Sequence, residues 1–172
     1  MNNNWTKVGR RDLEKTLNTL MNHQSILKFY KSREVKSPER VGLNAGFDFF
    51  IPNDFENKLL MPNESVNIPS GIKVKIPHGY ALIAFNKSGI AAKYQLIVGA
   101  SIVDENYIGE IHLNLINTNK YSVMLKSDMK IVQFALIKVN YAIPIEIYDE
   151  NNLYSDTDHK ERGDKGFGST GL

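Results

Sequence analysis

Glu110-Ile111-His112-Leu113-Asn114-Leu115 is the stretch that decides the fold. Its apolar residues alternate with polar ones, so an extended strand would have one apolar and one polar face. Short runs rich in β-branched and aromatic residues, broken by Gly, Pro and Asn, recur along the chain after His23. These runs are Ile26 to Lys31, Gly46 to Ile51, Ile72 to Ile76, Tyr80 to Phe85, Gly109 to Ile116, Tyr121 to Leu125, Lys130 to Val139 and Ile145 to Tyr148. Many short strands with turns between them predict an all-β sandwich or barrel.

The composition indicates one domain and excludes several kinds of site. The 172 residues, of which 42% are hydrophobic, can bury one core and are too few to favour two. With 21 basic and 19 acidic residues spread along the chain, the net charge is +2, so we expect no stable nucleic-acid binding. The absence of cysteine excludes disulfides, thiolate zinc sites and a thiol nucleophile. No apolar stretch is long enough for a membrane span or a secretion signal, so we expect no membrane association and a cytoplasmic location.

Three regions are expected along the chain. Residues 1–24 are expected to form a helical extension, because Leu13, Leu17 and Leu20 fall at helical spacing. This apolar stripe favours a packing or subunit-contact face. Residues 25–150 are expected to form the β-domain, and residues 151–172 a flexible C-terminal arm, because that end is polar and rich in glycine.

Residues 162–171 (RGDKGFGSTG) have the composition of a phosphate-binding segment. Glycines allow backbone amides to approach an anion, and Arg162, Ser169 and Thr170 add charge and hydroxyl donors. The spacing is not that of a P-loop. On composition alone a flexible polar tail is the simpler interpretation, but Phe167 has no packing reason to lie in such a tail and suits stacking on a base.

Two further clusters carry polar groups at strand ends. Residues 86–91 (NKSGIA) read, by themselves, as a solvated turn. Residues 99–110 (GASIVDENYIGE) place Asp104 in a turn, with Tyr107 three residues on. An Asp in such a turn is usually a turn or capping residue. The functional alternative is a carboxylate that orients and deprotonates a water beside an electrophile activated by metal and cations.

Five segments, in order, resemble the five motifs of the trimeric dUTPase family. They are residues 45–49 (AGFDF), 87–91 (KSGIA), 102–110 (IVDENYIGE), 130–133 (KIVQ) and 162–171 (RGDKGFGSTG). Residues 68–72 and 76–80 also resemble the family's segment between its first two motifs. The resemblance covers residues 41–172, and five ordered motifs are far more specific than any single one.

The resemblance implies a jelly-roll-like β-fold and a homotrimer with active sites between subunits. It also implies hydrolysis of dUTP to dUMP and pyrophosphate with Mg²⁺, which keeps uracil out of DNA and supplies dUMP for dTMP synthesis. By position, Asp104 is expected to activate the water that attacks the α-phosphorus, and Tyr107 to exclude a ribose 2′-hydroxyl. Main-chain groups of the hairpin from Val98 through Ser101 to Val103 are expected to bind uracil.

The remaining contacts implied by the resemblance involve the phosphates, the base and the metal. The expected substrate contacts are Lys87, Ser88, Gly89, Gln133, Arg162, Phe167, Gly168, Ser169 and Thr170. Asp48 is expected to support the water shell of the Mg²⁺, which otherwise binds through the substrate's phosphates, as a hard cation prefers.

Three positions depart from the family's pattern. Lys87 stands where Arg is usual, which replaces a bidentate fork by a point charge. Ser101 stands where glycine is common, and Asp164-Lys165 replaces small residues in the arm. None of these changes removes a group that the chemistry needs.

Other functions stay open at this point. The related dCTP deaminases use a glutamate on the strand after the third motif, whereas this chain has Asn114, whose amide cannot shuttle protons. A regulatory binding module is a second alternative, because some proteins that resemble the family, notably viral ones, also bind a partner protein. The N-terminal helix and residues 52–67 are the candidate surfaces for such a partner. A purely structural jelly-roll role leaves Asp104, Tyr107, Arg162 and Phe167 unexplained.

Overall fold

The computed structural model describes residues 25–154. The chain divides into two compact units, residues 1–140 and 141–172. The expected N-terminal helix and most of the expected C-terminal arm lie outside the described residues. The strands are β1 (Lys28–Lys31), β2 (Gly46–Phe50), β3 (Lys58–Leu60), β4 (Ser65–Lys75), β5 (Tyr80–Asn86), β6 (Leu96–Val98), β7 (Ile102–Val103), β8 (Glu110–Asn117), β9 (Val123–Leu125) and β10 (Lys130–Lys138).

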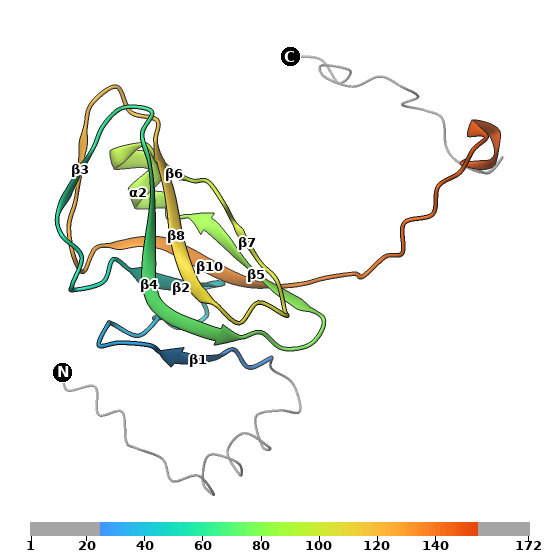
Figure 1. Cartoon of the computed structure of the whole chain (residues 1–172), viewed down its shortest axis with the longest axis horizontal. Helices are drawn as coiled ribbons and strands as arrows, with labels where there is room; N and C mark the ends of the chain where they lie inside the picture. Colours follow the sequence, from blue (N-terminus) through green and yellow to red (C-terminus); the bar gives the residue numbers. More distant parts are fainter. Residues whose placement is uncertain (1–24, 155–172) are drawn as a thin grey trace, which may run out of the picture. The chain divides into compact units, whose positions relative to one another are not determined.

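These strands form two four-stranded sheets and one two-stranded sheet, which confirms the all-β, jelly-roll-like fold. One sheet has the order β1-β4-β8-β6 and the other β2-β10-β5-β7, while β3 pairs with β9. Every pairing is antiparallel. Figure 1 shows β4 and β8 side by side along much of their length, as their pairing requires.

The core lies between the sheets and is built from the alternating residues of their strands. Ile111, Leu113 and Leu115 of β8 are all at most 1% exposed, as the alternation predicts. The second sheet contributes Phe49 from β2 and Phe134 from β10, whose ring centroids lie 4.6 Å apart. Side chains from both sheets belong to one continuous apolar cluster.

Residues 86–91 do not form the solvated turn that their composition suggested. Lys87 has an extended backbone (φ −77, ψ 119), and the helix α2 (Ser88–Tyr94) follows it directly. The amides of Ile90 and Ala91 both donate to the carbonyl of Lys87 at 2.9 Å, which closes the first turn. Two alanines in the helix favour this conformation.

The predicted strand Ile145–Tyr148 is wrong. This segment belongs to the second unit and forms no strand in the part of the chain that the structure describes. A strand needs a hydrogen-bonding neighbour, and among residues 25–154 no strand pairs with this segment. The described part of the second unit has instead a single 3₁₀ turn, η1 (Glu150–Asn152). Over residues 25–154, no helix has the length and apolar character that crossing a membrane demands.

Candidate active site

A cavity of about 250 Å³ lies beside the third motif-like segment. Its lining combines that segment with polar residues of β4 and β8 and one core aromatic. The lining residues are Asn67, Ala100, Ser101, Ile102, Val103, Asp104, Tyr107, Glu110, Ile111, His112, Asn114 and Phe134. The structure therefore brings Ser101, Val103, Asp104 and Tyr107 together, as the sequence predicts.

The segment from β6 to β7 is not the expected hairpin, because β6 pairs with β8 in one sheet and β7 pairs with β5 in the other. Two asparagine side chains fix this segment to the sheets. The Oδ1 atom of Asn114 accepts from the amide of Ala100 at 2.9 Å, and its Nδ2 atom donates to the carbonyl of Val66 at 3.2 Å. The Oδ1 atom of Asn86 accepts from the amide of Val98 at 2.7 Å. Gly99 fits because a Cβ there would stand 2.1 Å from Oδ1 of Asn114. The side chain of Asn114 thus positions the segment between β6 and β7. This role differs from the proton shuttling of the glutamate in a deaminase.

Asp104 and Tyr107 are held together by one turn between β7 and β8. The amide of Tyr107 donates to the carbonyl of Asp104 at 3.1 Å. The Tyr107 ring folds back over Gly109, and its hydroxyl donates to the carbonyl of Glu110 at 2.9 Å. Tyr107 is still 41% exposed, so one face of its ring is available at the cavity.

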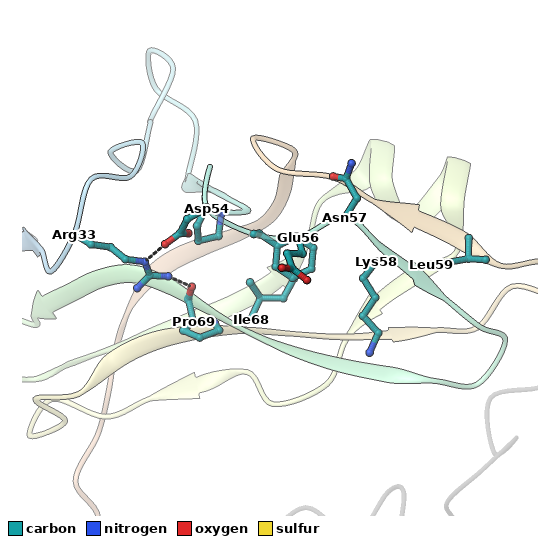
Figure 2. Close-up of a pocket in the computed structure, with 10 residues that line it drawn as sticks. Arg33, Asp54, Glu56, Asn57, Lys58, Leu59, Ile68 and Pro69 are labelled. Atoms are coloured by element: carbon teal, nitrogen blue, oxygen red, sulfur yellow. Dashed lines mark hydrogen bonds and ion pairs between the residues drawn. The ribbon is translucent and has the colours of Figure 1, made fainter.

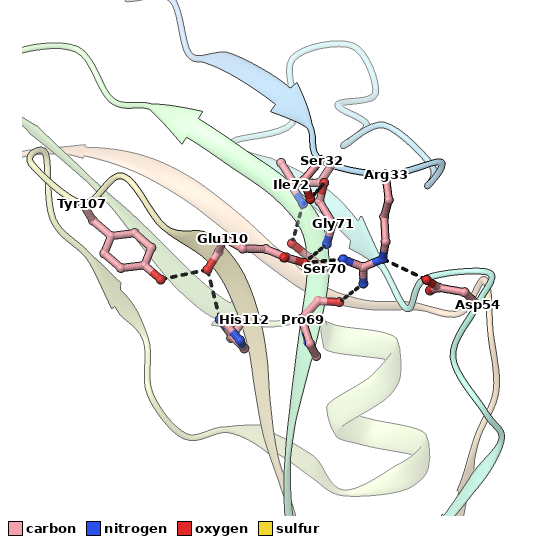
Figure 3. A network of polar contacts seen from close by, with 10 residues as sticks. All are labelled: Ser32, Arg33, Asp54, Pro69, Ser70, Gly71, Ile72, Tyr107, Glu110 and His112. Atoms are coloured by element: carbon pink, nitrogen blue, oxygen red, sulfur yellow. Dashed lines mark hydrogen bonds and ion pairs between the residues drawn. The ribbon is translucent and has the colours of Figure 1, made fainter.

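The Glu110 carboxylate joins this turn to a polar network, shown in Figure 3. It accepts from the Arg33 guanidinium at 2.7 Å and from the amide of Gly71. Partial burial acts to raise the pKa of the Glu110 carboxyl, but the bonds from Arg33 and Gly71 outweigh it and hold the pKa below its usual range. The same ion pair raises the pKa of Arg33.

A second polar cluster lies where β2, β5 and β10 meet the start of α2. The ammonium of Lys87 donates to both carboxylate oxygens of Asp48, at 2.9 and 3.0 Å. Gln133 is the cross-strand neighbour of Asp48, and its Nε2 atom donates to the carbonyl of Asn86 at 2.9 Å. Lys130 lies 3.9 Å from Asp48 and donates to Glu39 at 2.7 Å, and that bond raises the pKa of Lys130.

The predicted substrate residues thus fall into three groups. Ser101, Val103, Asp104 and Tyr107 line the cavity, and Val98 supports it. Lys87, Ser88, Gly89 and Gln133 belong to the second cluster or to α2, and none of them lines that cavity. Arg162, Phe167, Gly168, Ser169 and Thr170 lie outside the described residues.

Sequence reasoning missed the contributions of Asn67, His112 and Asn86. Asn67 reaches the cavity because it pairs with Asn114 across β4 and β8. The Nδ1–H group of His112 donates to the carbonyl of Glu110 at 3.0 Å. Asn86 contacts both the cavity residues and the second cluster, because its side chain accepts from the amide of Val98 and its carbonyl accepts from Gln133. The one sequence signal for the role of Asn86 was its position next to Lys87 at the end of a predicted strand.

Asp48 is the described residue that the sequence predicts to lie near a Mg²⁺ ion. Among residues 25–154, no three His, Cys, Asp or Glu side chains are grouped to form a metal cage. Asp48 offers a single carboxylate, and Lys87 already binds both of its oxygens. Such a donor suits contact with a metal-bound water rather than direct ligation.

A second, larger cavity of about 630 Å³ is shown in Figure 2. It lies beside the connection from β2 to β3, and Arg33 hydrogen-bonds there to Asp54 and to the carbonyl of Pro69. Of its charged side chains, Arg33 pairs with Asp54, and Lys58 pairs at 2.8 Å with Glu64, which is not part of the lining. None of the predicted site residues lines it, so the smaller cavity is the candidate active site.

Comparison with known proteins identifies the family of this chain. The dUTPase family model matches residues 35–171. A deoxyuridine 5′-triphosphate nucleotidohydrolase of Orientia tsutsugamushi is 35% identical over 116 residues, which cover 66% of this chain and 74% of that protein. One from Chlamydia trachomatis is 36% identical over 114 residues, covering 65% and 74%. The fold resembles that of the Staphylococcus bacteriophage 80alpha dUTPase solved with dUpNHpp, with a TM-score of 0.73 and 22% identity over 87% of this chain and all of that one. This chain belongs to the dUTPase family.

Proposed function

We propose that this chain hydrolyses dUTP to dUMP and pyrophosphate by means of a water molecule that Asp104 orients and deprotonates. The water oxygen attacks the α-phosphorus, the bond to the bridging oxygen breaks, and pyrophosphate leaves. The observation that carries this proposal is the single turn that places Asp104 and Tyr107 together at the cavity. Phosphoryl transfer asks mainly for positioning and charge neutralisation, so one well-placed carboxylate suffices as the base. We expect the protein to act in the cytoplasm.

The cavity is suited to the nucleoside part of the substrate. Main-chain groups of the segment Val98 to Val103 are the proposed contacts of the uracil edge, and Asn86 and Asn114 keep that segment in place by accepting from the amides of Val98 and Ala100. The exposed face of the Tyr107 ring is available to pack against a deoxyribose and to leave no room for a 2′-hydroxyl. A wall of this kind selects by steric exclusion.

The second cluster is suited to the phosphates. Lys87, Ser88 and Gln133 are the proposed phosphate contacts. In the absence of substrate, Lys87 and Lys130 are balanced by Asp48 and Glu39, so these four groups carry no net charge. Additional positive charge is then needed for a triphosphate. Mg²⁺ would supply it when bound to the phosphates, with Asp48 contacting its water shell, and Arg162, Ser169 and Thr170 of the arm would add further donors, with Phe167 and Gly168 covering the base.

We further propose that the active unit is a homotrimer. Among residues 25–154, the proposed phosphate contacts Lys87, Ser88 and Gln133 do not line the cavity that contains Asp104. A site that combines the cavity of one chain with the phosphate cluster of another resolves this separation. It also explains why Ser88 lies exposed at the start of α2.

The decisive experiment measures pyrophosphate release from dUTP, dCTP, dTTP and UTP with Mg²⁺. Asp104→Asn keeps the size of the side chain and removes the base, and the loss of kcat should be roughly 10²- to 10⁴-fold, the usual contribution of a general base. Retention of the circular dichroism spectrum and of the oligomeric state would exclude misfolding. A variant that retains full activity would refute the role of Asp104, and ammonia release from dCTP would support deamination instead.

A regulatory partner protein is a second proposal. Phage dUTPases such as that of Staphylococcus bacteriophage 80alpha control transfer of virulence genes by a proto-oncogenic G protein-like mechanism. In this chain, residues 52–67 carry the exposed charged side chains of the larger cavity. If such a partner binds there or at residues 1–22, deletion of residues 1–22 or charge reversal at Glu56 should abolish complex formation and leave dUTP hydrolysis unchanged. Loss of hydrolysis together with the trimer would make the N-terminal segment structural instead.

A further inference from the structure

An irregularity in β4 lies directly opposite Glu110. Pro69 pairs with His112 and Lys73 pairs with Glu110, so four steps along β4 face two steps along β8. Gly71 occupies this bulge with φ +76, and a Cβ there would stand 2.7 Å from the side chain of Val35. The bulge takes the amide of Gly71 out of the ladder, and that amide donates to the carboxylate of Glu110.

Arg33 holds the same region from the other side. Its guanidinium donates to Glu110 at 2.7 Å, to Asp54 at 2.9 Å and to the carbonyl of Pro69 at 2.8 Å. These three contacts diverge from one planar fork, as Figure 3 shows. Arg33 lines the larger cavity and does not line the one that contains Asp104.

The main chain of Glu110 connects this clamp to Tyr107. The carbonyl of Glu110 accepts from the Tyr107 hydroxyl at 2.9 Å, and the ring lies directly over Gly109. The location of the ring therefore depends on where β8 begins. That starting point is set by the Glu110 carboxylate, which is tied to Arg33 and to the bulge.

We propose that Arg33 and Glu110 are positioning residues that set the Tyr107 ring and thereby the discrimination of dUTP from UTP. This inference rests on the proposed role of Tyr107 as the wall against a ribose 2′-hydroxyl. Arg33 acts through Glu110 and lines no part of the cavity that contains Asp104, whereas Glu110 lines that cavity and acts on Tyr107 through its main-chain carbonyl. A small displacement of the ring opens space for the hydroxyl while the attacking water and its base stay in place.

The test compares kcat/KM for dUTP with kcat/KM for UTP in Arg33→Met, Arg33→Lys and Glu110→Gln. The ratio should fall by about 5- to 10-fold in Arg33→Met and in Glu110→Gln, because a hydrophobic wall discriminates by only about 10- to 200-fold in total. Arg33→Lys keeps the charge and loses the fork, so its ratio should lie between those of wild type and Arg33→Met. A ratio equal to that of wild type in all three variants would overturn the proposal, even if their thermal stability fell.

Lys58→Met is the matched control. Lys58 lines the same cavity as Arg33 and is likewise ion-paired, with Glu64, but it has no bond to Glu110. Its nucleotide ratio should equal that of wild type. A fall in this control as large as that in Arg33→Met would show a general effect of the cavity's charges and would contradict the clamp.

Tyr107 variants separate failure of the clamp from failure of the proposed site. If Tyr107→Ala leaves the ratio unchanged, the role assigned to Tyr107 is wrong and the clamp falls with it. If Tyr107→Ala abolishes discrimination and the clamp variants do not alter it, only the clamp is wrong. Arg33 and the Tyr107 hydroxyl both act through the hydrogen bond from that hydroxyl to the Glu110 carbonyl. Adding Arg33→Met to Tyr107→Phe should therefore lower the nucleotide ratio no further than the stronger single change does.

Discussion

Gly109 determines whether the Tyr107 ring can lie where the site needs it. A Cβ at Gly109 would stand 2.3 Å from the Tyr107 hydroxyl oxygen, a separation that no packing tolerates. Gly109→Ala should therefore displace the ring and lower kcat/KM for dUTP by roughly 100-fold, the cost of about 1 Å of misplacement at a reacting centre. Steady-state kinetics with dUTP measure this.

Gly79→Ala provides the comparison for Gly109→Ala. A Cβ at Gly79 meets nothing within 4 Å, so any loss there comes from its positive φ of +82 rather than from a collision. Its kcat/KM should stay close to that of wild type. Equal kinetic losses in the two variants would mean that the Tyr107 ring does not matter for catalysis.

Glu110 should make stability depend on pH in the acid range. Its folded-state pKa is lowered from the ordinary value of 4.5, so the folded state binds its proton less readily than the unfolded state. The resulting stabilisation is fully present above pH 4.5 and is lost as the pH falls through the lowered folded-state value. Glu110→Gln should cost about 1 kcal/mol at pH 7, because the ion pair is partly solvent-exposed. In urea unfolding, the difference between the two proteins should shrink below pH 4.5; a constant difference would contradict this account.

Individual site residues were predictable only where one segment carries several of them. Asp104 and Tyr107 lie on one turn, so the order of residues was enough to group them. Asn67 reaches the cavity by pairing with Asn114, and Arg33 acts on the turn through a 2.7 Å bond to Glu110. Both contacts join positions far apart in the sequence. Neither residue lies in a local sequence pattern that predicts its contact.

At the level of elements, strands with long alternation were predictable, and of the strands with two or three residues only β9 (Val123–Leu125) was. The alternation of β8 and the apolar run of β10 identified both strands. β7 has two residues and β3 and β6 three each, too few to display a period. α2 buries none of its residues, so it lacks the apolar stripe that identifies a helix. Ile145–Tyr148 had the composition of a strand, but composition does not supply a neighbouring strand.

The bulge in β4 is the element whose sequence requirement is sharpest. Gly71→Ala adds a Cβ at φ +76 that would stand 2.7 Å from Val35, so strain and overpacking combine. The expected loss of unfolding free energy is about 2–4 kcal/mol. Gly79→Ala has the same kind of backbone strain without the contact and should lose only about 1–2 kcal/mol. Urea unfolding of both variants measures the difference, and equal losses would show that Val35 gives way.

At the scale of the whole molecule, the separation of the cavity from the phosphate cluster leads to a test of assembly. If each active site joins Asp104 of one chain to Ser88 of another, two inactive variants can restore activity when they are mixed. Asp104→Asn lacks the base. Ser88→Glu places a negative charge against the phosphates, while the exposed first position of α2 tolerates it without harm to the fold.

Co-expression of these two variants with different affinity tags gives mixed assemblies that can be purified through both tags. Every mixed trimer then has one of its three sites with both intact groups, so roughly a third of wild-type activity should return. A double variant, Asp104→Asn with Ser88→Glu, co-expressed with Asp104→Asn is the control and should remain inactive, because no chain supplies the base. If the first mixture is also inactive although mixed trimers are recovered, Asp104 and Ser88 must serve the same site from within one chain. The described cavity would then have to rearrange on binding dUTP in order to reach the phosphate cluster.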